Sequence, residues 1–283
     1  MEYLRKVFNT REMRLEKPFI NIYPLVCMHF GAAQCDMAFI EAHIQRIKED
    51  PNGYWIYLGD AGECVTKQSK GDVYSQLLSP QGQQDLAVEL LEPIRGRGIF
   101  GIRGNHGQRI FRETGLSFDK NLCHRLGIPF LGVSAFMNLT VNRSSYDLFF
   151  HHGSDCGTAL QAKIARAERF TQMVNADALF TAHSHLCADL QPSVLYELDN
   201  ISQKIRTKLR RQYVCGAGYD SRTGYAEEKA YNPMLPAYLR VQFDGRIIRG
   251  EGQKSQDCQI YRSDGQHELQ HNYLSRIDPM ELV

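Results

Sequence analysis

Five short blocks of residues that are able to bind metals or contact phosphate stand far apart in the chain, each directly after an apolar stretch. They are CMH (27–29), GD (59–60), GNH (104–106), HHG (151–153) and AHSH (182–185), and they hold six of the ten histidines. Taken singly, each block is explained by a turn, a cap or a strand end. Taken together, the five supply thiol, imidazole, carboxylate and amide groups, which are ligands for divalent metals.

Hydrolysis of a phosphate ester is a reaction for which this set of groups is suited. The charge on the phosphoryl oxygens must be neutralised and a strong nucleophile is needed at neutral pH, and two cations about 3.5–4 Å apart supply both. One carboxylate must bridge the cations, and Asp60 is the candidate. His183 and His185 are predicted to point the same way from one extended segment, because side chains at i and i+2 share a face.

The surrounding pattern predicts a sheet with helices outside, which would bring the blocks together. Apolar residues at 37, 40, 44 and 47 form a helical stripe. We expect strands at 18–26, 54–60, 98–102 and 176–185, two strands within 130–153, and helices at 36–50, 158–174 and, as one helix or two, across 72–94. Residues 191–253 read as mainly β, including a stretch at 246–252. In open α/β sheets ligands bind outside the carboxyl ends of the strands, which is where the blocks fall.

Composition bounds the class of protein. The chain has 283 residues, 43% hydrophobic and 23% charged, as in an ordinary soluble α/β protein. Its N-terminus is highly charged and no apolar run reaches membrane-spanning length, so we expect a cytoplasmic protein without a membrane partner. The formal net charge of +1 gives no indication of a nucleic-acid partner. The eight cysteines form no CxxC pair and read as free thiols.

The ordered blocks resemble the calcineurin-like metallophosphoesterase family, whose pattern is D-x-H, G-D, G-N-H, H and G-H-x-H. The resemblance covers about residues 19 to 190, and residues 27–60 and 224–237 also resemble the phage and prophage branch of that family. It implies a four-layer α/β/β/α sandwich of two mixed sheets. We expect a single domain over residues 1–253, with a motif core at 19–190 and a β-rich second half at 191–253, followed by a polar tail at 254–283.

The resemblance also implies a role for each matching residue. One metal would be held by Cys27, His29, Asp60 and His185, and the other by Asp60, Asn105, His151 and His183. His106 would contact the phosphoryl oxygen or protonate the leaving group, with Asn105 as a further phosphate contact. His152 is the alternative to His151 as ligand, or its support. Arg103 is the arginine best placed by sequence to reach the substrate phosphate, since arginine matches phosphate oxygens bidentately.

Cys27 stands where the family has Asp. A thiolate is soft and suits Zn²⁺ or Fe²⁺ better than Mg²⁺ or Mn²⁺. Three explanations stay open: a site retuned toward a softer metal, a weakened site with one metal or none, or a buried cysteine that binds nothing. Gly107 and Ala182 are two smaller departures, at positions where relatives carry an acidic residue and Gly. The implied cofactors are two divalent ions drawn from Mn²⁺, Zn²⁺ and Fe²⁺.

The expected function is hydrolysis of a phosphodiester or phosphomonoester by an activated hydroxide at a dinuclear site. One alternative is a nuclease, because Lys204, Arg206, Lys208 and Arg210 alternate along a predicted strand. The ordinary explanation of that stripe is a solvated edge strand protected by charge. A second alternative is a catalytically weakened descendant that serves as a binding module. The sequence makes no prediction of the oligomeric state.

Overall fold

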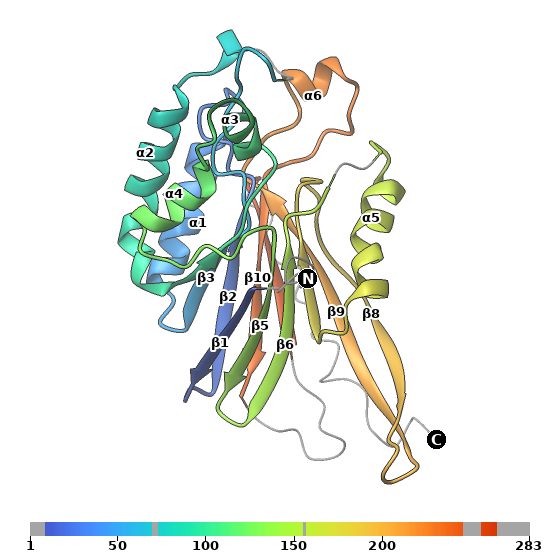
Figure 1. Ribbon diagram of the computed structural model, residues 1–283. Coiled ribbons are helices and arrows are strands. Elements are labelled where there is room, and N and C mark those ends of the chain that lie inside the picture. Colours follow the sequence, from blue (N-terminus) through green and yellow to red (C-terminus); the bar gives the residue numbers. More distant parts are fainter. Residues whose placement is uncertain (1–8, 70–72, 155–156, 246–255, 265–283) are drawn as a thin grey trace, which may run out of the picture.

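In the computed structural model, the described residues are 9–69, 73–154, 157–245 and 256–264, and they form β-sheets flanked by helices (Figure 1). The strands are β1 (Asn9–Leu15), β2 (Phe19–Leu25), β3 (Gly53–Tyr57), β4 (Gly98–Gly101), β5 (Ser134–Val141), β6 (Ser144–His151), β7 (Ala178–Thr181), β8 (Cys187–Leu198), β9 (Ile205–Ala217), β10 (Ala237–Asp244) and β11 (Gln256–Arg262). The helices are α1 (Met37–Glu49), η1 (Val73–Ser75), α2 (Pro80–Leu91), η2 (Glu92–Arg97), α3 (Gly107–Thr114), α4 (Phe118–Arg125), α5 (Leu160–Met173) and α6 (Tyr225–Glu228). None of the described helices is both long and apolar enough to cross a membrane.

The first sheet is built from β2, β3 and β4, which run parallel; β10 lies antiparallel beside β2, and β11 pairs antiparallel with β10. Helices α1, α2 and α4 lie along its outer side (Figure 1). The predicted apolar stripe explains how α1 packs on the sheet, because Ile40, Ile44 and Ile47 are buried. Asp36 caps the helix by accepting a hydrogen bond from the Phe39 N–H, and the chain turns away at Asp50 before Pro51.

The second sheet runs in the order β1, β5, β6, β7, β9, with β8 beyond β9. β5 and β6 form an antiparallel hairpin, whereas β6, β7 and β9 pair in parallel. Helix α5 covers the outer side of this sheet (Figure 1). Because β6, β7 and β9 run parallel, their carboxyl ends lie along the same edge of the sheet.

The two sheets pack face to face through aromatic side chains. The ring centroids of Phe100 and Phe150 are 5.3 Å apart, and those of Tyr146 and Phe243 are 5.0 Å apart. The predicted α/β/β/α sandwich is therefore confirmed. The sheets are not separate, however, because two residue pairs join β9 to β10: Ala217 with Ala237, and Gly216 with Tyr238.

Three segments differ from the sequence expectation. The charged N-terminal stretch contains β1, a strand that pairs in parallel with β5. The sequence did not predict it, because most of its residues are polar and exposed and show little apolar alternation. The predicted helical region 72–94 is broken, since Ser79 caps α2 and only η1 precedes it. Part of the expected polar tail forms β11, which pairs with β10 from Ala237 to Phe243. The expected β stretch at 246–252 lies outside the described residues.

Candidate metal centre

The five blocks follow the carboxyl ends of β2, β3, β4, β6 and β7, as predicted. Their backbone is held in an unusual conformation. Positive φ angles occur at five of the candidate ligands: Cys27 (47°), His29 (52°), Asp60 (58°), His183 (67°) and His185 (58°). This left-handed conformation disfavours residues with a Cβ atom and concentrates at functional sites. Hydrogen bonds between the first two blocks hold it, from the Cys27 N–H to Gly59 O (3.1 Å) and from the His29 N–H to Asp60 O (3.2 Å).

Glycine at position 104 lets the third block approach Asp60. A Cβ atom on Gly104 would lie 2.0 Å from Asp60 Oδ1, well inside contact distance. The same close approach allows the His106 N–H to donate to Asp60 Oδ1 at 2.8 Å. The carboxylate is therefore fixed by the loop that carries Asn105 and His106.

His29 and His185 form the first part of the centre. Nδ1 of His29 lies 2.9 Å from Glu63 Oε2, so it carries the proton and its Nε2 presents a lone pair. That Nε2 lies 3.0 Å from Nε2 of His185. Burial is the main cause that lowers the pKa of both imidazoles; His106 lowers that of His29 further, and His29 and His183 lower that of His185 further, so both favour the neutral form. Two neutral imidazoles facing each other in this way fit a shared cation.

His152, Asp60 and Asn105 form the second part. Nδ1 of His152 lies 2.5 Å from the carbonyl oxygen of Leu58, to which it donates. Nε2 of His152 faces two oxygens, Asp60 Oδ2 at 2.9 Å and Asn105 Oδ1 at 3.0 Å. A positive charge is needed among these three atoms, either a proton or a metal ion. Burial opposes the charged form of His152, but Asp60 outweighs burial and raises its pKa.

The preference for His151 over His152 as ligand is not supported by the geometry. His151 is the last residue of β6, and its ring packs 4.6 Å from Phe170 of α5, on the outer side of the sheet. The alternative, His152, occupies the place foreseen for His151. The alternation of Tyr146, Asp147 and Leu148 already indicates that even-numbered positions of this strand face inward.

Cys27 lies between the two parts and is fully buried. Among the described residues, potential ligand atoms gather in three groups, within each of which all atoms lie inside 4.8 Å of one another: Cys27, His29 and His185; Cys27, Asp60 and His152; His29, Asp60 and His106. Burial first, and then the charge of Asp60, raises the pKa of the Cys27 thiol. This donor set of soft sulfur, imidazole and carboxylate fits Zn²⁺ or Fe²⁺.

His183 and His185 do not sit on an extended segment, so that part of the prediction is wrong. With both residues left-handed, the two rings reach different neighbours. The His183 ring lies 5.4 Å from the ring of His152, and the His185 ring 4.9 Å from that of His29. One short segment thus still serves both parts of the centre.

Glu63 and Arg109 belong to the site, although the sequence singled out neither as a ligand support. The Glu63 carboxylate holds His29 and lies 3.4 Å from Nδ1 of His106. Arg109 Nη1 donates to Glu63 Oε1 at 3.0 Å and its Nη2 lies 3.4 Å from His106 Nε2. Arg103, by contrast, is held through its backbone N–H on Gly132 O, and among the described contacts Arg109 is the arginine that reaches the cluster.

Asp119 of α4 is a further buried carboxyl behind the centre. Its Oδ1 accepts a hydrogen bond from the Tyr57 hydroxyl at 2.5 Å, and that hydroxyl accepts one from the Ala61 N–H. A Cβ atom on Gly107 would lie 2.5 Å from Asp119 Oδ2, so the departure from an acidic residue at 107 leaves room for Asp119. Burial raises the pKa of Asp119 to about 7.

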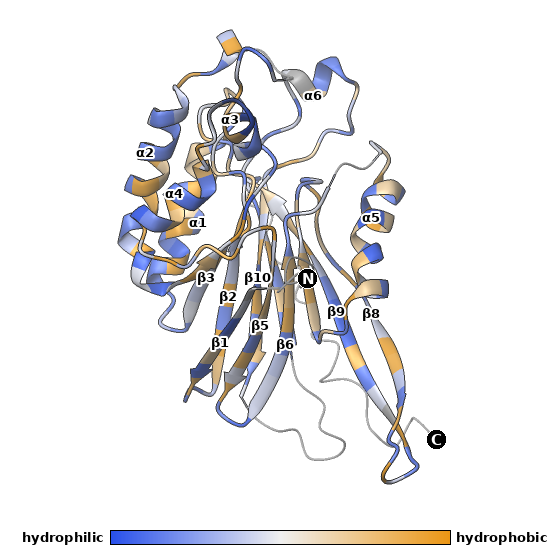
Figure 2. Ribbon diagram, viewed as in Figure 1, coloured by the Kyte–Doolittle hydropathy of each residue, from blue (hydrophilic) through white to orange (hydrophobic). Residues whose placement is uncertain are grey.

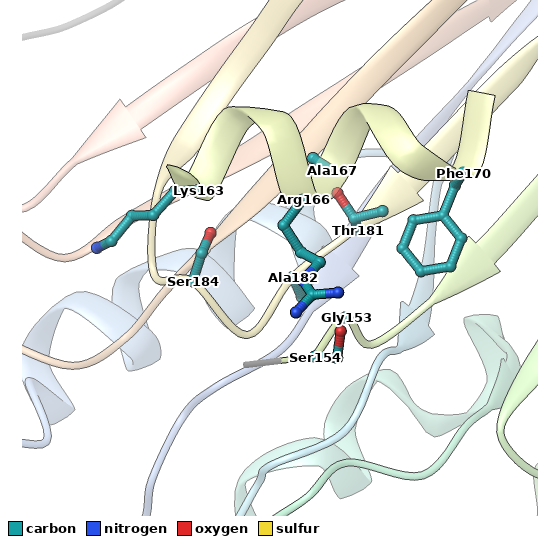
Figure 3. A pocket seen from close by; sticks show the side chains of 9 residues that line it. All are labelled: Gly153, Ser154, Lys163, Arg166, Ala167, Phe170, Thr181, Ala182 and Ser184. Atoms are coloured by element: carbon teal, nitrogen blue, oxygen red, sulfur yellow. The ribbon is translucent and has the colours of Figure 1, made fainter. Parts of the chain in front are cut away.

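A small pocket lies between α5 and the segments that follow β6 and β7 (Figure 3). Lys163 and Arg166 of α5 line it together with Gly153, Ala182 and Ser184. These last three residues are neighbours of His152, His183 and His185 in sequence. Arg166 thereby places positive charge beside the loops that carry the candidate ligands, whereas the Lys163 ammonium group lies 3.2 Å from Met234 Sδ (Figure 3).

Comparison with known proteins gives the fold and no more. No family model and no curated protein matches the sequence. Among solved structures, GAP50, the anchor in the inner membrane complex of Plasmodium, superposes with a TM-score of 0.51 at 9% identity, over 90% of this chain and 89% of that one. Vps29 of Cryptosporidium parvum gives 0.48 at 12% identity (90% and 100%), and a metallophosphoesterase of Sphaerobacter thermophilus 0.38 at 13% (86% and 88%). The chain has the fold of the first of these.

Proposed function

We propose that this chain is a metal-dependent phosphoesterase of the calcineurin-like family that acts through a dinuclear centre. The observation that supports the proposal is that candidate ligands from distant segments of the chain lie together in one buried cluster. Side chains from segments up to 156 residues apart, such as His29 and His185, meet with nitrogen atoms 3.0 Å apart. Facing imidazole nitrogens, a buried carboxylate and left-handed backbone at the candidate ligands are together characteristic of a site built to hold cations.

Under this proposal, His29, His185 and Cys27 would hold one ion and His152, Asn105 and His183 the other, with Asp60 shared. Bound ions would neutralise charge on the phosphoryl oxygens and lower the pKa of water to near neutrality. Asp60 suits the shared position because three imidazoles, those of His152, His106 and His29, outweigh its burial and hold its pKa well below the usual range. It would stay ionised at every pH at which the enzyme works.

His106 is the proposed general acid. Its Nδ1 lies 2.9 Å from the carbonyl oxygen of Glu63, which fixes the ring. Burial disfavours the imidazolium, but Asp60 and Glu63 outweigh burial and raise the pKa of His106. The protonated ring is the form that donates to the oxygen of a leaving group. Arg109 adds a fixed positive charge beside it, and Arg166 adds another in the small pocket next to Gly153 and Ala182, which suits an anionic phosphate ester.

The nuclease alternative loses support from the basic stripe on β9. Lys208 Nζ lies 3.4 Å from Asp177 Oδ1, and Arg210 donates to the carbonyl oxygen of Thr171. Half of the stripe is thus used inside the fold rather than offered to a nucleic acid. We therefore favour a small phosphate monoester or diester as substrate.

Hydrolysis of p-nitrophenyl phosphate and of bis(p-nitrophenyl) phosphate, with Mn²⁺, Zn²⁺, Fe²⁺ or Mg²⁺ added to metal-free protein, tests the proposal. We expect turnover with at least one metal, loss of both turnover and metal in Asp60→Asn, and loss of turnover with metal retained in His106→Ala. The absence of turnover with every metal, together with bound metal in the wild type, would favour the binding-module alternative instead.

A further inference from the structure

Strands β8 and β9 continue beyond the rest of their sheet as a two-stranded arm, here defined as residues 193–198 and 205–210 with the connecting turn. In Figure 1 the arm extends away from the body at the end opposite the metal centre. Within the described chain β8 pairs only with β9, so the arm has no other strand beside it. A lone two-stranded ribbon is at best marginally stable in water, so the arm needs further packing.

The register of the arm gives it two distinct faces, because residues directly opposite each other in an antiparallel pair share a face. On the first face, called here the apolar arm face, Val194 stands opposite Leu209, Tyr196 opposite Thr207 and Leu198 opposite Ile205. These six residues carry no charge.

The other face of the arm is the one used by the body. It carries Lys208, whose ammonium group lies 3.1 Å from Asn175 Oδ1, and Arg210, which is bonded to α5 through Thr171. The partners of these two side chains lie in and after α5, so this face is turned toward the helix layer. The apolar arm face is therefore turned away from α5.

The apolar arm face is open over the part of the chain that the structure describes. Val194 is 48% exposed, Tyr196 76%, Leu198 58% and Ile205 69%, and Ile201 in the turn is 97% exposed. Figure 2 shows these apolar stretches standing apart from the body of the protein. Farther along β9 the same face carries Tyr213, which is completely buried between the sheets. The face of β9 that is buried between the two sheets at Tyr213 therefore continues into the arm, where the first sheet no longer covers it.

We propose that the apolar arm face is the interface between two copies of this chain, packed about a twofold axis. A twofold interface places each patch against itself, so it requires a surface without like charges, and this face has none. The exposed parts of its large side chains and of Ile201 add up to roughly 600 Å², near the ~800 Å² per partner of a stable interface and at the upper end of the apolar patches that monomers expose. The second copy would give each arm the packing that a ribbon lacks alone.

Sedimentation velocity over a range of protein concentrations from about 1 to about 100 µM tests this proposal. We expect a dimer for the wild type and a dissociation constant raised by at least about tenfold in the double variant Tyr196→Asp with Leu198→Asp. Ser193→Asp, on the opposite face of the same strand, is the matched control and should leave the dimer unchanged. All three positions are exposed, so the variants should keep the circular dichroism spectrum and the phosphoesterase activity of the wild type.

Three results would overturn the proposal. The wild type could stay monomeric throughout the concentration range. It could dimerise with the same affinity in the double variant, which would place the interface elsewhere. A chain truncated after Asp264 could dimerise where the full chain does not, which would mean that the last 19 residues cover the face within one copy.

Discussion

Replacing Asp119 by Asn should change how the stability of the protein depends on pH. Asp119 is 1% exposed, and burial, with a further contribution from Asp60, raises its pKa to about 7 from an ordinary value of 3.8. Between these two pH values the folded protein keeps a proton that the unfolded chain has released. The free energy of unfolding therefore falls as pH rises through this window, and this contribution of Asp119 is fully present only below about pH 4.

The size of the effect follows from the shift. A difference of about three pKa units corresponds to ~4 kcal/mol at about 1.4 kcal/mol per unit, which is an upper bound. The Asp119→Asn variant has no such proton to lose. Its free energy of unfolding, relative to that of the wild type, should therefore rise by up to that amount between pH 4 and pH 8.

Guanidinium unfolding of metal-free protein at several pH values measures this difference, with the buried single tryptophan, Trp55, as the fluorescent probe. Tyr57→Phe supplies a second comparison. The Tyr57 hydroxyl donates to Asp119 and lowers its pKa, so its removal should move the window to higher pH. A difference between variant and wild type that is the same at pH 4 and pH 8 would refute the reasoning.

Three further outcomes are expected. Cys27→Asp should shift the metal content of protein purified without added metal from Zn²⁺ or Fe²⁺ toward Mn²⁺, measured by elemental analysis; an unchanged metal identity and stoichiometry would mean that the thiol binds no ion. His152→Ala should lower activity on the order of 100-fold and release metal, whereas His151→Ala should stay close to wild type in both assays. Gly104→Ala should cost about 3 kcal/mol in thermal unfolding because its Cβ meets a carboxylate oxygen, whereas Gly96→Ala, whose Cβ meets nothing within 4 Å, should cost almost nothing. Equal melting temperatures for the two glycine variants would contradict the crowding at position 104.

The order of the five blocks could be read from the sequence because each block needs only to follow a strand, and apolar strands are easy to recognise. The choice between His151 and His152 needed finer information, namely which side of β6 faces the core. That information is present in the alternation around Asp147, but the adjacent Phe149 and Phe150 obscure it, since both are buried, one on each side of the sheet.

Other parts of the site could not be predicted because they depend on contacts between distant segments. Glu63 follows Asp60 in an irregular loop, and only the folded chain shows that it meets His29 and His106. Asp119 lies in the first turn of the amphipathic helix α4. An acidic residue at that position is ordinarily explained by its favourable interaction with the helix dipole, so the sequence gives no reason to expect it in the site. Its burial against Tyr57 depends on how α4 sits on the sheet.

The narrow junction between β9 and β10 has a consequence for the whole molecule. Within the described residues, β9 and β10 pair at only two positions, and the candidate ligands are divided across this seam, with Cys27, His29 and Asp60 on one side and His152 and His185 on the other. An ion bound by ligands from both sides of the seam would link the two halves of the molecule. Chelation would then remove one link between the halves, so loss of metal should lower the cooperativity of unfolding as well as abolish catalysis.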